Sequence, residues 1–175
     1  MKYDRPWMAY IEIVSTIKFH CGGSVINKRY VLTAAHCTCD QLPCAVDQND
    51  DLQINYEPKG KLTVYLGFKD TKKRKLKPEN IYPVVEIKVH EKYRQDFHDM
   101  ALLKVERDIV FGPKVAPICM PLGPKFPDTG HKGFVAGWGH VKNRQENKTT
   151  LYLRTSTYEY SLYAYDQSTN IYNTG

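Results

Sequence analysis

The stretch that decides the fold is Leu32-Thr33-Ala34-Ala35-His36-Cys37. The run before it, from Val25 to Val31, is rich in β-branched and aromatic residues, which predicts a strand. Two alanines follow, and their small side chains let the backbone pack closely just before the histidine. An imidazole held at one place on a rigid element is what a general base requires. The stretch therefore indicates a histidine, His36, held at the end of a strand as a general base would need to be.

Four further blocks extend this stretch in both directions along the chain. They are Arg5-Pro6-Trp7-Met8-Ala9-Tyr10-Ile11, His98-Asp99-Met100-Ala101-Leu102-Leu103-Lys104, Val115-Ala116-Pro117-Ile118-Cys119-Met120-Pro121 and Gly133-Phe134-Val135-Ala136-Gly137-Trp138-Gly139. All five blocks resemble segments of the chymotrypsin-like, trypsin-fold (S1-type) serine proteases, including the invertebrate clip-type enzymes. They occur in family order over residues 5–141, and five ordered matches are a strong signal where a single one would be weak. After about Val141 the resemblance stops.

The resemblance implies an all-β chain, with the N-terminal six-stranded barrel of the chymotrypsin-like double β-barrel and an incomplete second barrel. We expect the first barrel over 5–120, a connector and the first strand of the second barrel over 121–148, and a divergent tyrosine-rich tail over 149–175. Alternating apolar residues predict strands, and Gly22 and Gly23 predict a turn over 20–24. A single strand is expected over 133–141. The alternation in the tail permits an edge strand, with disorder as the equal alternative. The predicted strands of the first barrel cover residues 5–19, 24–33, 62–67, 81–90 and 100–105.

By resemblance, His36 is the catalytic base and Asp99 the carboxylate that orients it. The apolar residues after Asp99 would draw its carboxylate into a low-dielectric environment beside the ring. The family presents its nucleophile within Gly-Asp-Ser-Gly-Gly, and no such run occurs here. None of the serines has the flanking glycines of that tight turn, and Ser24, which follows two glycines, lies on the histidine-side strand. The serines are Ser15, Ser24, Ser156, Ser161 and Ser168.

The function implied by the family is serine-type endopeptidase activity. Because the nucleophile segment is missing, we expect a truncated, inactive form of such a protease, which belongs to a class made as zymogens. The alternative is a non-catalytic serine-protease homologue that acts as a binding or regulatory module, although such homologues usually keep the second barrel. A more distant alternative is a zinc module, but the spacing of His36, Cys37, Cys39 and Cys44 fits no common structural zinc pattern. We therefore expect no metal and no cofactor.

The five cysteines indicate an oxidising compartment. Cys21 and Cys37 match the histidine-loop disulfide of the family, and Cys39 and Cys44 are close enough in sequence to staple the loop that follows. Cys119 is left unpaired, and in two-chain relatives the cysteine at this point tethers a propeptide or light chain. The N-terminus has no apolar signal core. Cysteine usage and the family nevertheless predict an extracellular protein, and the missing signal is therefore interpreted as truncation.

The formal net charge of +6 is moderate and partly local. The basic cluster between residues 69 and 77 is either a solvated loop or an anion-binding exosite beside the substrate cleft. Protein substrates or inhibitors are the expected partners. Nucleic acid is not expected, because no recognition motif accompanies the charges, and neither is a membrane, because no apolar run is long enough to span one. Asn147-Lys148-Thr149 is an N-glycosylation sequon. The basic cluster consists of Lys69, Lys72, Lys73, Arg74, Lys75 and Lys77.

Overall fold

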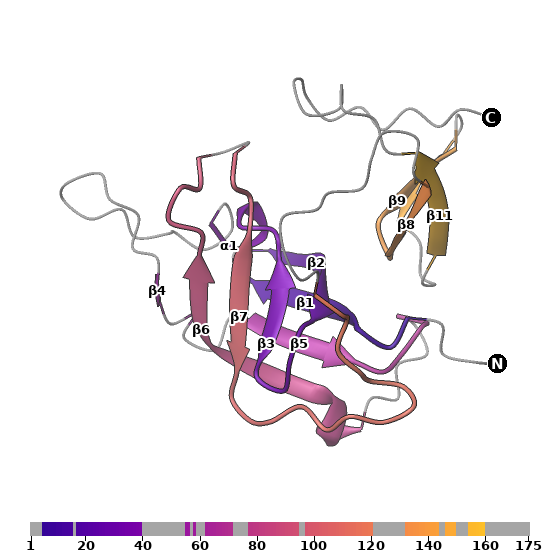
Figure 1. Ribbon diagram of the computed structural model, residues 1–175. Helices are drawn as coiled ribbons and strands as arrows, with labels where there is room; N and C mark the ends of the chain where they lie inside the picture. The colour runs from indigo at the N-terminus through magenta and orange to yellow at the C-terminus, as the bar shows by residue number, and fades with distance from the viewer. Residues whose placement is uncertain are drawn as a thin grey trace.

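The computed structural model describes most of the N-terminal two thirds of the chain and several strands beyond it (Figure 1). The described residues are 5–15, 17–39, 55–56, 58, 62–71, 77–94, 97–120, 132–143, 146–149 and 154–159. Among them no helix has the length and apolar character needed to cross a membrane. The elements in chain order are β1 (Met8–Val14), β2 (Lys18–Val25), β3 (Tyr30–Thr33), α1 (His36–Cys39), β4 (Asn55–Tyr56), β5 (Leu62–Leu66), the 3-10 turn η1 (Pro78–Asn80), β6 (Ile81–Val89), β7 (Ala101–Val105), β8 (Lys132–Gly137), β9 (His140–Asn143), β10 (Glu146–Thr149) and β11 (Arg154–Glu159).

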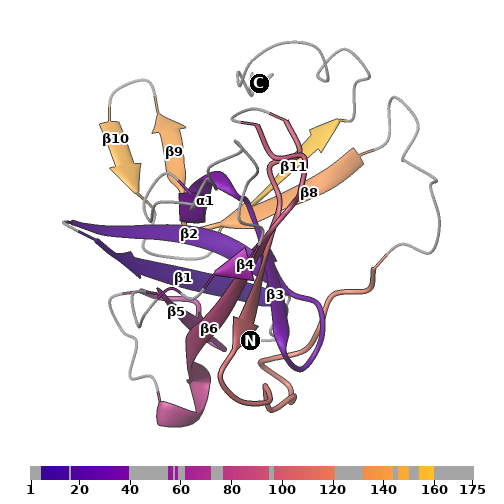
Figure 2. The same cartoon turned by 90° about the vertical axis from the view of Figure 1, so that its left-hand side faces the viewer.

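The first seven strands form one antiparallel sheet in the order β4-β6-β5-β1-β2-β3-β7. A further pairing of β6 with β7 closes this sheet, so β1, β2, β3, β5, β6 and β7 make a six-stranded barrel with β4 added outside it (Figures 1 and 2). Closure leaves those six strands without free edges, which antiparallel sheets otherwise have to protect. The predicted all-β class and six-stranded first barrel are confirmed.

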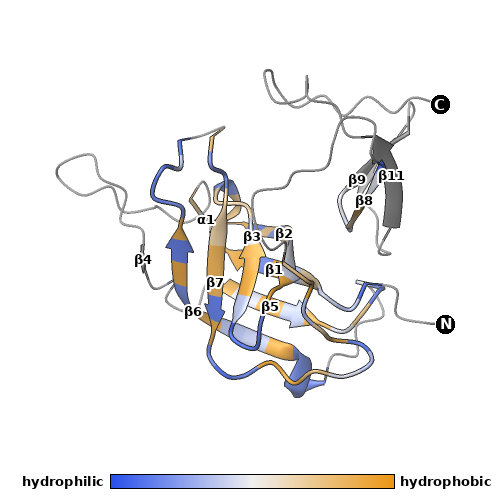
Figure 3. Ribbon diagram, in the orientation of Figure 1, coloured by the Kyte–Doolittle hydropathy of each residue, from blue (hydrophilic) through white to orange (hydrophobic). Residues whose placement is uncertain are grey.

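The barrel interior is filled by alternate residues of its strands. Ile11 and Ile13 on β1, Val64 and Leu66 on β5, and Leu103 on β7 are fully buried. The residues between them face outward, so apolar and polar positions alternate along the ribbons (Figure 3). This period of two is the pattern that a strand with one buried face requires.

The predicted turn over residues 20–24 is wrong, because β2 runs through it as a continuous strand from Lys18 to Val25. Gly23 serves close packing here rather than a turn. A Cβ built on it would lie 2.9 Å from the Ile11 Cδ1 atom and 2.9 Å from the Leu32 carbonyl oxygen. Glycine therefore lets the barrel interior and the backbone of β3 approach β2.

The C-terminal described strands pair in two short sheets, β8 with β11 and β9 with β10. Strand β11 lies within the predicted tail, which corresponds to the edge-strand alternative for residues 154–159. The single strand expected over 133–141 is instead broken between β8 and β9. The cause is Trp138, which is buried, stacks on Phe68 at 5.3 Å and donates its indole N–H to the Lys69 carbonyl at 3.1 Å.

Candidate active site

His36 is placed by the junction of β3 and α1. The Thr33 hydroxyl donates to the Gly22 carbonyl at 2.8 Å and ties the end of β3 to β2. Ala35 is fully buried, and the Thr38 hydroxyl donates to its carbonyl at 2.9 Å, which closes the short helical turn. The small side chain at position 35 is therefore needed because α1 lies directly on the barrel core.

A disulfide between Cys21 and Cys37 joins β2 to α1, as the resemblance implied. Cys39 is also disulfide-bonded, whereas its expected partner Cys44 lies outside the described residues. Cys119 is a free, exposed thiol. The covalent link at Cys37 restrains the residue next to His36 and so limits the movement of the imidazole.

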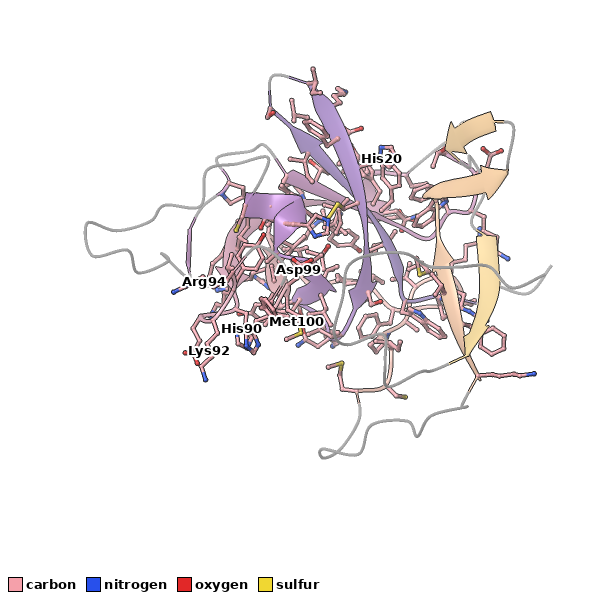
Figure 4. The ribbon with its side chains drawn as sticks, turned by 90° about the horizontal axis from the view of Figure 1, so that it is seen from above. His20, His90, Lys92, Arg94, Asp99 and Met100 are labelled. Carbon is pink, nitrogen blue, oxygen red and sulfur yellow. A yellow bond between two sulfur atoms is a disulfide. The ribbon has the colours of Figure 1, made fainter. Side chains whose placement is uncertain are left out.

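Asp99 is held by a tight turn directly before β7. The backbone N–H of Met100 donates to the His98 carbonyl at 2.7 Å, and the N–H of His90 donates to the Met100 carbonyl at 2.9 Å. The second bond continues the β6–β7 ladder beyond its last pair, Val89 with Ala101, and the first closes the turn around Asp99. The carboxylate therefore projects from a fixed backbone, and Asp99 lies close to α1 (Figure 4).

His36 and Asp99 meet through two contacts, although 63 positions separate them in the sequence. The His36 Nδ1 atom lies 2.6 Å from the Asp99 Oδ2 atom, and the His36 backbone N–H donates to Oδ1 at 2.8 Å. A hydrogen bond to the carboxylate places the ring proton on Nδ1, which leaves the Nε2 lone pair available as a base. The Nε2 atom lies 3.6 Å from the disulfide sulfur of Cys37.

The pair is more open to solvent than the sequence predicted. The side chains of His36 and Asp99 are 53% and 30% exposed. The apolar residues that follow Asp99 alternate along β7, so only every second one packs inward toward the core. Asp99 is thus half-buried at the rim of the barrel rather than enclosed by it.

No hydroxyl group among the described residues hydrogen-bonds to His36. Ser15 follows β1, Ser24 lies on β2 opposite Leu32, and Ser156 belongs to β11, while Ser161 and Ser168 lie outside the described residues. The described part of the chain therefore presents a base with its orienting carboxylate and no nucleophile for them to activate.

A metal site at this position conflicts with the disulfide. The donor atoms of Cys21, His36 and Cys37 lie within 4.8 Å of one another, a spacing that could suit a metal ion. Zinc binds cysteine as a thiolate, and both sulfurs are already bonded to each other. In this oxidised form, only the imidazole of the three side chains can act as a ligand.

The other predicted sites are described in part. Lys69 and Lys77 lie in the described residues, and Lys77 forms an ion pair with Glu79 at 3.5 Å. Residues 72–75 of the basic cluster lie outside the described part, so the exosite stays a prediction. Asn147 lies on β10.

The sequence motifs single out neither His90 nor His98 as a functional residue. The structure stacks the two rings, with centroids 4.8 Å apart and an angle of 10° between the planes. No sequence signal marks this pair, because the residues come from opposite ends of the loop between β6 and β7. The pairing of β6 with β7, extended by the bond from the His90 N–H to the Met100 carbonyl, brings them together.

Comparisons with known proteins agree with one another. The family model described as Trypsin matches residues 1–174. The chain is 33% identical over 160 residues to "Serine protease grass" of Drosophila melanogaster, which covers 85% of this chain and 40% of that protein. It is 34% identical over 174 residues to "Venom serine protease 34" of Apis mellifera, which covers 91% of this chain and 39% of that protein.

A similar solved structure, named "Structure of GrC", has a TM-score of 0.65 and 30% identity, and the match covers 89% of this chain and 61% of that one. The chain thus spans about two fifths of the length of the curated relatives named above. The family match continues past residue 141, where the recognisable motifs end, and includes β11. The resemblance therefore extends farther along the chain than the motifs indicated.

Proposed function

The chain belongs to the trypsin family of serine proteases, and from this premise we propose that His36 and Asp99 are the base and the orienting acid of a serine endopeptidase site. The observation that carries the proposal is the double contact between them. One carboxylate oxygen orients the ring and the other holds the backbone of the same residue. An ion pair with a purely structural role on the barrel surface would need only the contact between the carboxylate and the ring.

In the proposed reaction, the Nε2 atom of His36 takes the proton of a serine hydroxyl as that oxygen attacks the peptide carbonyl. Asp99 keeps the second ring proton on Nδ1 and stabilises the imidazolium that forms. The histidine then returns the proton to the leaving amine. The substrates are proteins, and the trypsin-family names of the relatives support this class without naming a sequence preference.

We propose that the 175 residues alone do not hydrolyse peptides. They contain no Gly-Asp-Ser-Gly-Gly run, which in the family supplies both the nucleophile and the backbone donors for the oxyanion. Loss of an oxyanion-hole donor costs roughly 10²–10³ in rate, and loss of the serine removes the covalent route. An active enzyme would need that segment from additional chain.

The test compares the 175-residue chain with the longest natural product that carries these residues, using peptide amides and a fluorophosphonate probe. We expect no hydrolysis and no labelling for the short chain. A longer product with a Gly-Asp-Ser-Gly-Gly peptide is expected to hydrolyse amides and to lose that activity in His36→Ala but not in His20→Ala. Hydrolysis by the short chain that depends on His36 would overturn the inactivity proposal. Full activity of the longer His36→Ala protein would overturn the role of His36.

We further propose that the protein is secreted and that Cys119 attaches a propeptide or light chain in a zymogen. The Cys21–Cys37 disulfide and a relative named as a venom protease support an extracellular location. The exposed thiol of Cys119 supports the attachment. Mass spectrometry of the natural product without reduction tests the attachment, since a disulfide-linked peptide at Cys119 is expected, and an alkylatable thiol there would contradict it.

A further inference from the structure

The stacked pair of His90 and His98 lies at the base of the loop that carries Asp99. Its ring centroids are 4.8 Å apart and nearly parallel. His98 is exposed and His90 is half-buried, so both rings can be reached from solvent. In Figure 4, His90 lies beside Met100, while Lys92 and Arg94 lie farther out along the loop and His20 lies on another side of the barrel.

The backbone holds both histidines in place. The His90 N–H donates to the Met100 carbonyl and the Met100 N–H donates to the His98 carbonyl, at 2.9 and 2.7 Å. The loop is braced again at its far end, where Arg94 and Phe97 exchange two backbone hydrogen bonds. His98 has a φ of 53°, a region that residues other than glycine seldom occupy, and the surrounding bonds hold it there.

We propose that His90 and His98 form a binding site for a divalent transition-metal ion, with Zn²⁺ as the reference ligand and Cu²⁺ and Ni²⁺ as chemically similar ones. Imidazole nitrogen is a preferred ligand of these ions. Zinc–nitrogen bonds are about 2.0–2.1 Å long, so two nitrogens on one tetrahedral ion lie roughly 3.3 Å apart. The two rings are nearly parallel here, so their in-plane lone pairs do not yet point at one ion, and coordination requires rotation about the side-chain bonds of both histidines.

The hydrogen bonds of His90 define what the metal must displace. Its Nδ1 atom accepts the N–H of Lys92 at 3.1 Å, which puts the ring proton on Nε2. Coordination through Nε2 moves that proton to Nδ1 and breaks the Lys92 bond, whereas coordination through Nδ1 replaces the bond directly. In either case a neutral imidazole donates one lone pair and keeps its proton, so no net proton release is required. Water completes the coordination shell.

The charges around the pair are mixed. Lys88 is held by Glu86 at 3.3 Å, and the Arg94 guanidinium donates to the Tyr93 carbonyl at 2.8 Å, so both cations have partners. Lys92 and Glu91 are exposed and of opposite sign. With two protein ligands and no net negative surroundings, the site is expected to bind more weakly than a four-ligand structural zinc site and to exchange its ion readily.

The experiment titrates the oxidised chain with Zn²⁺ by calorimetry and follows the histidine ring signals by NMR. We expect one ion per chain, with the signals of His90 and His98 shifting first. His90→Gln and His98→Gln are each expected to lower the affinity by at least roughly tenfold, the minimum loss seen when a metal site loses even a supporting residue. His20→Gln is the matched control, because this exposed histidine stacks on Tyr10 elsewhere on the barrel, and its affinity should be unchanged.

Three outcomes would overturn the proposal: no saturable binding, equal losses in His20→Gln and His90→Gln, or a loss confined to His36→Gln, which would place the ion on the candidate catalytic pair. Thermal denaturation of each metal-free variant identifies any that fail to fold. If one variant fails to fold, the shifts of the His90 and His98 ring signals in the unmodified chain test the proposal without it. None of these results depends on peptide hydrolysis, so the failure of this proposal and the failure of the proposed function are distinguishable.

Discussion

At the scale of single residues, the candidate site depends on one carboxylate with two partners. Asp99 contacts both the ring and the backbone of His36, at 2.6 and 2.8 Å. The motifs around each residue identify both from sequence. The second contact is not predictable in that way, because it requires the first residue of α1 to face the turn before β7.

Asp99→Asn tests this contact. The asparagine amide would donate toward Nδ1, which favours the ring tautomer with its proton on Nε2 and removes the base. We expect the downfield Nδ1 proton signal of His36 to disappear in the NMR spectrum of the chain. In a longer product that carries the nucleophile, kcat should fall by about 10⁴, the loss known for the equivalent change in another triad of this family. An unchanged kcat would reject the role of Asp99.

Gly23→Ala tests the close approach of β2 to its neighbours. The new Cβ would lie 2.9 Å from the Leu32 carbonyl oxygen, and a backbone atom cannot yield cheaply. We expect a loss of roughly 1–3 kcal/mol in the free energy of unfolding, measured with urea. Gly22→Ala is the control, because a Cβ there meets no atom within 4 Å. Equal effects of the two substitutions would show that the packing argument is wrong.

At the scale of elements, strand identity is predictable and strand register is not. The alternation of apolar residues locates β1, β5, β6 and β7, because one face of each strand must be buried. It does not show that Val31 pairs with Leu103, or that β6 and β7 close the barrel. The first pairing joins segments far apart in the chain and the second joins consecutive strands, but the alternation within a strand specifies neither partner.

The disulfide between β2 and α1 should stabilise the chain mainly by restraining the unfolded state. The two cysteines are 16 positions apart, and a closed loop of that size contributes about 3 kcal/mol. We expect the double variant Cys21→Ala/Cys37→Ala to lose that amount in urea denaturation and to broaden the His36 ring signals. Cys119→Ala removes a free thiol and should leave stability unchanged. A stable double variant with sharp His36 signals would contradict this.

An ion pair across β6 and β7 gives stability a pH dependence. Lys104 donates to Glu86 at 2.9 Å, and this hydrogen bond is the largest cause that lowers the pKa of Glu86 below its ordinary value of 4.5. Desolvation opposes this shift, while Lys88 adds to it. The same bond raises the pKa of Lys104. The contribution of Glu86 is therefore complete above pH 4.5 and is lost as the pH falls through its lowered folded-state pKa.

Glu86→Gln should accordingly lower the melting temperature at neutral pH, and the difference from the natural chain should shrink as the pH falls well below 4.5. The effect is expected to be small, because the pair is partly exposed to solvent. Glu79→Gln is the control, since its pair with Lys77 is largely exposed and should contribute little. A difference that grows on acidification would contradict the sign of the pKa shift.

At the scale of the whole molecule, the first barrel is closed, whereas strand β8 beyond it keeps large apolar side chains exposed. Phe134 and Val135 are neighbours on β8, so their side chains point to opposite faces, yet they are 66% and 50% exposed. Strand β8 therefore exposes apolar side chains on both of its faces. Exposed apolar patches tend to be buried by association.

We expect concentration-dependent association in sedimentation velocity experiments. Phe134→Ser should weaken it by roughly tenfold or more, because burying such a ring contributes about 1.5–3 kcal/mol. Val110→Ser is the control, since this residue is 68% exposed but lies on a connecting segment of the barrel. If the chain sedimented as a monodisperse monomer at all concentrations, the exposed apolar side chains of β8 would not drive association, and the argument would be wrong.

The sequence by itself determined the family, the all-β class and the first barrel, and it pointed to His36 and Asp99 as the candidate pair. These depend on local order and on period-two alternation, which any strand with one buried face must show. Tertiary structure alone decided that residues 20–24 continue a strand, that Trp138 ends β8 by packing on Phe68, and that His90 stacks on His98. The physical reason is common to all three. Each depends on which segments pair or pack against one another, and the local sequence does not specify that partner.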